Sequence, residues 1–254
     1  MLLVPLATGA VVAAGSAFRG LPLAFFVIAA LSLFWLRTPV EAWLGTSAIK
    51  AHSRQERVTV VNLMFLPLAV AIAAIAILFV RGYWRGLLGI GAVAALSFAL
   101  QAAVKRRGRR ARIPAQIIGA VGLTSTAAGA YYVASGHLSY VAFTLWAANW
   151  LFAANQVHFV QLRIHAGRLS TVLEKIQQGR VFLVGQVVLL AGVAALSLMR
   201  VFPKLTLLAF IPAIARGTLW FFRGQQPLDV HKLGFSELCQ VIAFGALLSA
   251  AFLV

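Results

Sequence analysis

Long apolar runs, separated by short polar gaps, constrain this chain more than any other feature of its sequence. Nine runs have or approach the length that a helix needs to cross a bilayer, about 17–25 mostly apolar residues. Their richness in Ala and Leu favours helices over strands. The predicted spans are roughly Leu2–Phe18, Leu21–Leu36, Val58–Val80, Gly86–Val104, Pro114–Ser135, Tyr140–Leu162, Val181–Met199, Leu205–Phe222 and Phe235–Val254. We therefore expect an all-α, polytopic transmembrane helix bundle of about nine spans, with residues 1–254 forming a single integral membrane domain.

The composition excludes a soluble or disordered chain. Hydrophobic residues make up 62% of the sequence and charged residues 11%, whereas a soluble domain has about 45–50% apolar residues. In a soluble protein the formal net charge of +17 would indicate a nucleic-acid partner. Here the charges stand in gaps between apolar runs, so we expect the lipid bilayer as partner and no nucleic acid. The single cysteine, Cys239, excludes an internal disulfide and a Cys-rich metal site.

Lys and Arg are divided unevenly between the loops. The loops after spans two, four, six and eight carry 17 of them, and the loops after spans one, three, five and seven carry five. Because cytoplasmic loops collect Lys and Arg, the first set is predicted to be cytoplasmic, with the N-terminus inside and the C-terminus outside. The expected location is a bacterial cytoplasmic membrane. All five carboxylates fall on the predicted cytoplasmic side, so acid–base or metal chemistry is expected there.

The span from Tyr140 to Leu162 is the most polar of the nine. Asn149 and Gln156 are seven residues apart and share one face, while Asn155 and His158 lie on a neighbouring face. Polar side chains at bilayer depth normally point into the bundle. They indicate either a polar cavity open to the cytoplasm or interhelical hydrogen bonds that hold the bundle together.

Two loops carry further candidate groups. Arg37 and Glu41 lie at the start of loop 2. They are either an anion-binding arginine beside a general base, or part of a helix start in which the Glu41 carboxylate interacts favourably with the helix dipole. In the segment 223–237, Asp229 and His231 are two residues apart. They either bind a metal ion or a proton together, or belong to a solvated loop. Glu237 either joins them or lies in the first turn of the last helix. The candidate vestibule residues are Arg37, Glu41, Asn149, Asn155, Gln156, His158, Arg223, Asp229, His231 and Glu237.

A polybasic run follows the fourth span. It contains Lys105, Arg106, Arg107, Arg109, Arg110 and Arg112. Beside a span, such a run is expected to anchor the topology and to contact anionic lipid headgroups. No Walker A, His-Glu-x-x-His or Gly-x-Ser-x-Gly sequence is present, and no aspartate lies inside a span. The missing aspartate argues against an ion-coupled transporter, because such proteins usually bury carboxylates along the ion path.

The run RGQQPLDVHKLGFSEL (223–238), which leads into VIAFGALL, resembles the C-terminal signature of the YwiC-like family of bacterial membrane proteins. The start MLLVPLATG, the segment 37–43 and the segment 149–159 are similar to the family as well. The resemblance implies a polytopic membrane protein and no known reaction. Family members carry a Pro-(Arg/Lys)-(Glu/Gln)-His-Gly-Ala-Trp motif before the first span, and it is absent here. Either the short start is genuine or the start codon is misplaced and residues are missing before Met1, and any activity that depends on that histidine is in doubt.

The predicted layout is also similar to that of UbiA-type intramembrane prenyltransferases. Those enzymes hold Mg²⁺ against a diphosphate with Asp-rich motifs on loops 2 and 6. Here the two loops contain no aspartate, only Glu41, Glu56 and Glu174. Prenyl transfer with Mg²⁺ held by Asp-rich motifs is therefore not expected.

Three functions agree with the sequence. The first is a membrane-embedded protein that binds or transports a small molecule through a polar cytoplasmic vestibule. The second is a UbiA-like intramembrane enzyme acting on an anionic or isoprenoid lipid. The third is an accessory subunit of a membrane complex. The sequence assigns no metal ligand set, and it leaves the cofactor and any protein partner open.

Overall fold

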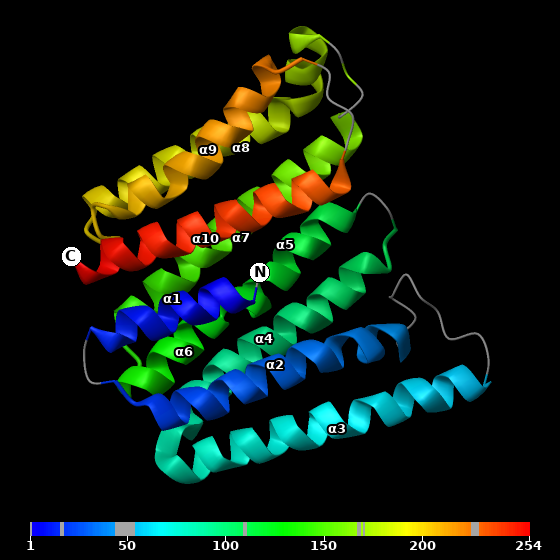
Figure 1. The fold of residues 1–254 in the computed structure, drawn as a ribbon, viewed down its shortest axis with the longest axis vertical. Helices are drawn as coiled ribbons and strands as arrows, with labels where there is room; N and C mark the ends of the chain where they lie inside the picture. The colour runs from blue at the N-terminus through cyan, green and yellow to red at the C-terminus, as the bar shows by residue number, and fades with distance from the viewer. Residues whose placement is uncertain are drawn as a thin grey trace.

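The computed structural model describes residues 2–15, 18–43, 54–108, 111–166, 169, 171–224 and 229–254. Within this part of the chain every regular element is a helix, and the helices lie roughly side by side (Figure 1). In chain order they are α1 (Leu3–Ala14), α2 (Gly20–Trp43), α3 (Arg54–Leu78), the π-helical turn η1 (Phe79–Tyr83), α4 (Trp84–Lys105), α5 (Arg112–Thr124), α6 (Thr126–Ser135), α7 (Tyr140–Ala166), α8 (Val172–Leu198), α9 (Thr206–Phe222) and α10 (Val230–Leu253). The predicted all-α class is confirmed.

The helices correspond to the nine predicted spans, because α5 and α6 together form one of them. Five segments of the described chain are long and apolar enough to cross a membrane: Gly20–Trp43, Val61–Lys105, Arg112–Ser135, Val172–Leu198 and Val230–Leu253. The second of these reverses direction at Gly82, whose φ of 89° needs a residue without a Cβ. It therefore provides two antiparallel helices, α3 and α4 (Figure 1). Helices α1 and α9 are apolar but shorter.

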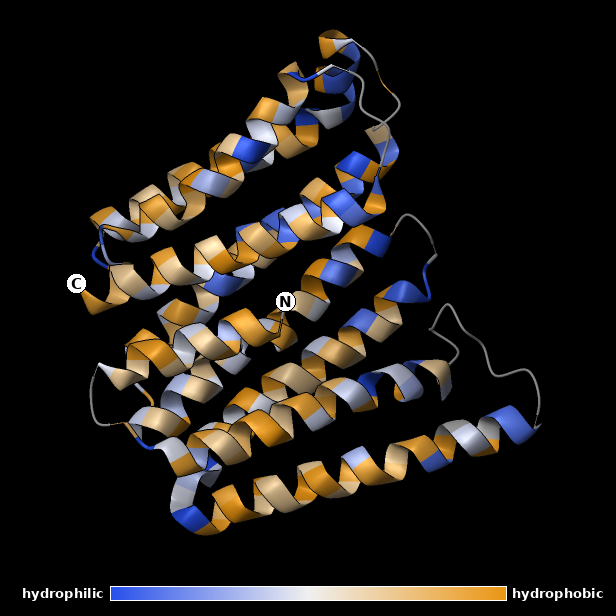
Figure 2. Cartoon of the chain, viewed as in Figure 1, coloured by the Kyte–Doolittle hydropathy of each residue, from blue (hydrophilic) through white to orange (hydrophobic). Residues whose placement is uncertain are grey.

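The helices run between two opposite ends of the bundle. The last residues of α2, α4, α7 and α9 and the first residues of α3, α5, α8 and α10 lie at one end, which we call the even-loop end, and the opposite helix ends lie at the other (Figure 1). Hydrophilic residues are concentrated toward the even-loop end, while the middle of most helices is hydrophobic (Figure 2). The division of charge in the sequence is thus a division between the two ends of the fold.

The predicted fifth span is interrupted near its middle. Thr124, Ser125 and Thr126 donate their hydroxyl groups to the carbonyl oxygens of Ala120, Gly122 and Leu123, at 2.7 Å each. Hydroxyl groups that bond back to their own helix often bend it. This accounts for the break between α5 and α6 without a proline.

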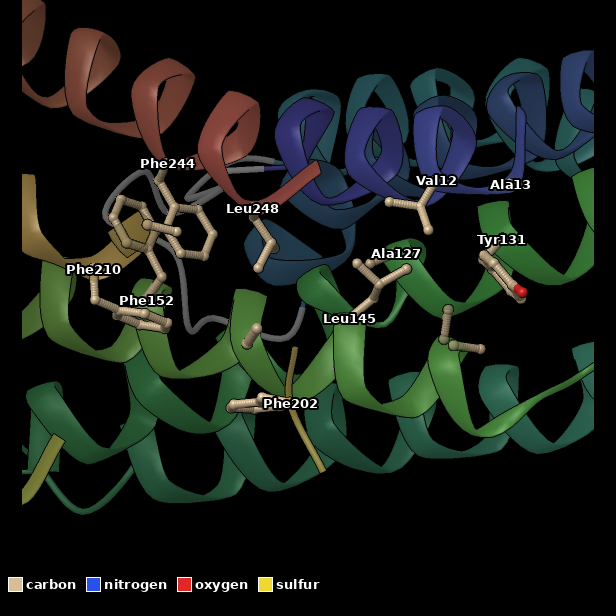
Figure 3. Close-up of a cluster of buried hydrophobic side chains, with 14 of the residues drawn as sticks. Val12, Ala13, Ala127, Tyr131, Leu145, Phe152, Phe202, Phe210, Phe244 and Leu248 are labelled. Carbon is tan, nitrogen blue, oxygen red and sulfur yellow. The ribbon is translucent and has the colours of Figure 1, made fainter. Parts of the chain in front are cut away.

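The central core is aromatic and lies between α7, α9 and α10. The rings of Phe152 and Phe244 stack with centroids 3.9 Å apart, and Phe210 meets Phe244 edge to face (Figure 3). On the other side of the core, α1 approaches α6 so closely that a Cβ at Gly9 would overlap the carbonyl oxygen of Ala127. Small residues at such contacts let helix backbones pack tightly in membrane proteins.

Three helices extend five or more residues beyond the predicted spans. Helix α2 continues through Pro39 to Trp43, and α8 begins at Val172 rather than at Val181. Helix α10 begins at Val230 rather than at Phe235. The additional turns are polar or charged, so hydropathy alone did not extend the spans over them. The predicted helix start at Arg37–Glu41 is therefore wrong, because these residues lie in the last turns of α2.

Helices α2 and α3 form a hairpin that stands apart from the rest. Helix α3 packs on α2 and on η1, and α4 packs on α5, while α2 reaches the rest of the bundle mainly through α6. Residues of α2, α4 and α5 line the hollow described below.

Candidate functional site

Two groups of polar side chains lie toward the even-loop end. The first, on α2 and α4, contains Arg37, Glu41, Gln101 and Lys105, and we call it the rim cluster. The second, on α7, α8, α9 and α10, contains Gln156, Arg163, Lys175, Arg216 and Glu237, and we call it the internal cluster. The structure thus divides the predicted vestibule between two regions.

The rim cluster is a network of ion pairs between two helices. Arg37 donates its Nε–H to Glu41 Oε1 at 2.9 Å, and Lys105 Nζ lies 2.9 Å from the other oxygen, Glu41 Oε2. Arg37 also donates from a terminal nitrogen to Gln101 Oε1 at 3.2 Å. The cluster therefore joins α2 to α4 and carries two cations for one carboxylate.

A cavity of about 650 Å³ begins beneath the rim cluster. Arg37 and Gln101 line one part of it, and the remaining wall is mostly aliphatic and aromatic. Its large side chains include Phe26, Leu33, Phe34, Leu88, Ile90 and Phe98. Ligand pockets usually have volumes of about 300–1,000 Å³ and apolar walls with a few polar groups. The cavity has these properties.

The cavity wall offers few free polar groups and opens sideways. The hydroxyl of Ser97, which lines the cavity, donates to the carbonyl of Ile118 and accepts from the Gly122 N–H, so it is used within the fold. Leu33 is 47% exposed and Leu88 is 52% exposed, although both line the cavity. The hollow is therefore open laterally, where the surrounding medium of a membrane helix is lipid.

The internal cluster is built around Arg216. Its terminal nitrogens donate to Glu237 Oε1 at 2.6 Å and Oε2 at 3.3 Å, and to Gln156 Oε1 at 2.5 Å. The guanidinium also lies 4.3 Å from the ring centroid of Phe159. Arg216 is six residues from the last residue of α9, and Glu237 is seven residues from the first residue of α10, so both lie about 10 Å inside their helices. Ionisable groups at such depth are rare in membrane helices and mark functional sites.

Two more cations lie between Arg216 and the loops. Arg163 stands over the ring of Trp220, 5.7 Å from its centroid, and Lys175 Nζ is 5.3 Å from the same ring. Lys175 is only 2% exposed, and it donates to the carbonyl oxygens of Arg223 at 2.5 Å and Gly224 at 3.4 Å. Cation–π contacts and neutral carbonyls stabilise these cations without neutralising them.

The remaining predicted residues of the seventh helix have different environments. Asn149 is 2% exposed and donates to Thr8 Oγ1 at 3.1 Å and to the Leu145 carbonyl, so it joins α7 to α1. This supports the interhelical hydrogen bonding predicted as its alternative role. Asn155 accepts from Gln186 on α8, and the His158 ring meets Phe182 edge to face. These two residues therefore lie beside the internal cluster.

The predicted group in loop 8 is not one site. Asp229 accepts from the backbone N–H groups of His231 at 3.0 Å and Lys232 at 3.1 Å, and it is the N-cap of α10. These donors, the Lys232 N–H first, hold the pKa of its carboxyl below the ordinary value. His231 and Arg223 are exposed. The assignment of Glu237 to the first turn of α10 is wrong, because the helix begins seven residues earlier.

The polybasic run is divided by the fold. Lys105 belongs to the rim cluster, as described above, and is therefore more than a topology anchor. Arg106, Arg107 and Arg112 are exposed at the even-loop end, where headgroups could reach them. Arg109 and Arg110 lie outside the described residues.

The vestibule predicted from the sequence lacked four members of the two clusters, Gln101, Arg163, Lys175 and Arg216, and the neighbouring Gln186 and Trp220. Gln101, Gln186 and Arg216 each interrupt an apolar run, which is the signal of an intramembrane polar site. Arg216 was counted among the loop charges, although it lies inside α9. Lys175 and Trp220 give no comparable signal, because a lysine near a helix start and a tryptophan near a helix end are common at membrane boundaries.

Metal ligation finds no support in the described part of the chain. No group of three His, Cys, Asp or Glu side chains in these residues could hold a metal ion. The cations outnumber the carboxylates in both clusters, so each cluster carries a net positive charge.

Comparison with known proteins identifies the family. The model of the YwiC-like protein family matches residues 1–131, just over half of the chain. The match covers α1 to α5 and most of α6, including the rim cluster and the cavity, whereas the C-terminal run that resembles the family lies beyond it. No curated protein and no solved structure matches the chain. This chain is a member of the YwiC-like protein family.

Proposed function

We propose that this protein is a membrane-embedded binding protein, with a role in transport, for a single amphipathic molecule. Its ligand has an apolar chain, which lies in the cavity between α2 and α4, and an anionic head, which meets Arg37 and Lys105. The observation that carries the proposal is the position of the rim cluster at the mouth of an apolar hollow. In this proposal the rim cluster is the polar vestibule and faces the cytoplasm of a bacterium.

The cavity supports the apolar part of the ligand. Its large side chains are aliphatic or aromatic, and the hydroxyl of Ser97 is bonded to the backbone. Its lateral opening between half-exposed leucines would admit a chain directly from the bilayer. A ligand that enters in this way does not have to pass through water.

The rim cluster supports the anionic head. Arg37 and Lys105 share the single carboxylate of Glu41, so the cluster keeps one net positive charge. A guanidinium has five N–H donors, and those not engaged with Glu41 and Gln101 can bond to oxygens of a carboxylate or phosphate. The exposed Arg106, Arg107 and Arg112 would contact headgroups of the surrounding bilayer and not the ligand in the cavity.

A fluorescent fatty acid, added to the full chain in neutral nanodiscs, tests the proposal. We expect saturable binding that the neutral methyl ester of the same acid does not show. Arg37→Gln should weaken the binding about ten-fold, the effect of losing one charge-assisted hydrogen bond of about 1.5 kcal/mol. Arg106→Gln is the matched control, because Arg106 follows Lys105 directly but is exposed, and it should bind as the unmodified chain does.

Two results would overturn the proposal. Equal binding of the acid and its methyl ester would show that the protein does not recognise an anionic head. Equal losses in Arg37→Gln and Arg106→Gln would show that only general surface charge matters. Recovery of the fatty acid with an altered mass would instead support the intramembrane enzyme, and flux of unaltered acid across liposomes would support transport.

A further inference from the structure

The internal cluster holds more positive charge than the chain can neutralise there. The sequence contains five carboxylates in all, and one of them, Glu237, lies in this cluster. The nearest others in sequence are used at helix starts: Glu174 is exposed in the capping box of α8, and Asp229 caps α10. Arg163, Lys175 and Arg216 therefore share a single countercharge.

Arg216 and Arg163 lie at successive levels along the interface between α7 and α9. Gln156, Phe159 and Arg163 follow one another along one side of α7, and Arg216 and Trp220 follow one another along α9. Arg216 contacts Gln156 and Phe159, while Arg163 lies over Trp220. Arg163 is thus about one turn nearer the loops than Arg216, and Arg216 repels its charge.

Several buried donors of this cluster have no hydrogen-bond partner within the described residues. They are the Nε–H groups of Arg163 and Arg216 and the amide nitrogen of Gln156. Gln156 is 0% exposed, so its amide cannot reach bulk solvent. A buried donor without a partner is costly, since it has lost its bonds to water. These groups need acceptors, and an anion supplies both acceptors and charge.

We propose that the internal cluster binds a phosphate-type oxyanion between Arg163 and Arg216. Gln156 donates its amide N–H to this anion, and Lys175, near the start of α8, adds positive charge. A polyatomic oxyanion fits better than a halide because several separate donors must be satisfied. Lys175 and Arg163 lie within two turns of their helix ends, so the site is nearer to the even-loop end than to the opposite end. This site is separate in its residues from the amphiphile site proposed above.

The test is binding of inorganic phosphate to the purified full chain in detergent. Binding is monitored through the thermal unfolding temperature, and phosphate is compared with chloride at the same ionic strength. We expect a saturable rise in the unfolding temperature with phosphate. Arg163→Gln should abolish the rise, whereas Arg180→Gln should keep it, because Arg180 is an exposed arginine on the neighbouring helix α8.

A second variant keeps the test decisive if Arg163→Gln does not fold. Gln156→Leu retains the size of the side chain and removes the donor, so it should weaken phosphate binding several-fold with the cations intact. Nanodiscs containing phosphatidic acid, compared with phosphatidylcholine alone, identify the source of the anion. Protection by the acidic lipid points to a headgroup, and protection by free phosphate alone points to a soluble anion. Equal effects of phosphate and chloride, or equal losses in Arg163→Gln and Arg180→Gln, overturn the proposal.

Discussion

The rim cluster and the internal cluster use the same kinds of side chain in opposite arrangements. At the rim, Arg37 lines an apolar hollow and forms an ion pair with Glu41, which also pairs with Lys105. In the internal cluster, Arg216 and Glu237 lie inside the helix packing and against an aromatic ring. A charge at a mouth can exchange a protein partner for a headgroup or water, whereas a charge inside cannot. We therefore expect changes at the rim to alter binding and changes inside to alter folding as well.

Removing one member of the Arg216–Glu237 pair should give the largest effect. Glu237→Leu leaves the Arg216 guanidinium without its carboxylate in a low-dielectric surrounding, and we expect a loss of about 3–5 kcal/mol in the free energy of unfolding. The corresponding change at the rim, Glu41→Leu, should cost about 1 kcal/mol or less, because its partners Arg37 and Lys105 are about a quarter exposed and stay in contact with solvent. Unfolding by a denaturing detergent, followed by circular dichroism, measures both.

The double variant Arg216→Met/Glu237→Leu is the control for this comparison. It removes both charges together, so it should recover most of the stability lost in Glu237→Leu. If the two losses simply add, or if Glu237→Leu is as stable as the unmodified chain, the pair does not have the internal role given to it here.

Two glycines test whether only one region is hollow. A Cβ at Gly179 on α8 would lie 2.6 Å from the ring of Phe221, whereas nothing lies within 4 Å of a Cβ at Gly91, which lines the cavity on α4. Gly179→Leu should therefore lose about 1–3 kcal/mol of stability through overpacking. Gly91→Leu should keep the melting temperature and still block the fatty acid. A large loss of stability in Gly91→Leu would mean that the hollow is filled by packing in the folded protein.

Neutralising Glu41 separates a binding role from a catalytic one. Glu41→Gln raises the net charge of the rim cluster from +1 to +2, counted from Arg37, Lys105 and Glu41. We expect three- to five-fold tighter binding of the fluorescent fatty acid, equivalent to about 0.7–1 kcal/mol. A general-base role would instead make the same variant inactive in forming a product. Weaker binding in Glu41→Gln would contradict the electrostatic account of the mouth.

The smallest effect is expected at Asp229, outside both clusters. Its pKa lies below the ordinary value because the Lys232 and His231 N–H groups bond to the ionised carboxylate. A lowered pKa in the folded state stabilises the fold above the unfolded pKa, and this stabilisation is lost as the pH falls through the folded pKa. Hydrogen exchange in the first turn of α10 should accelerate in that acidic range, and Asp229→Asn should remove most of the pH dependence. An unchanged pH profile in that variant would assign the effect to other groups.

The helical class and the number of spans follow from the sequence because hydropathy is a local property. A run of apolar residues must be a helix in lipid, since no water is present to bond its backbone. The gathering of the charged loops at one end also follows, because consecutive spans must alternate in direction. Helix ends were less accurate, since the polar last turns of α2 and the polar first turns of α8 and α10 look like loops in a hydropathy pattern.

The division of the predicted vestibule was decided by tertiary structure. Asn149, Asn155, Gln156 and His158 lie on one helix, yet Asn149 joins α7 to α1 while Gln156 bonds to Arg216 on α9. Which face of a polar helix meets which neighbour depends on how all the helices pack. A single sequence carries no direct record of that packing.

The sequence by itself determined an all-α membrane protein with cationic loops on one side, five carboxylates and similarity to the YwiC-like family. Only the tertiary structure decided which charges meet: Glu41 with Lys105, 64 positions away in the numbering, and Arg216 with Glu237 on the next helix. It alone also placed a hollow between α2 and α4. The physical reason is range, because hydropathy and charge bias act within one segment, whereas ion pairs and cavities arise where segments distant in the chain pack together.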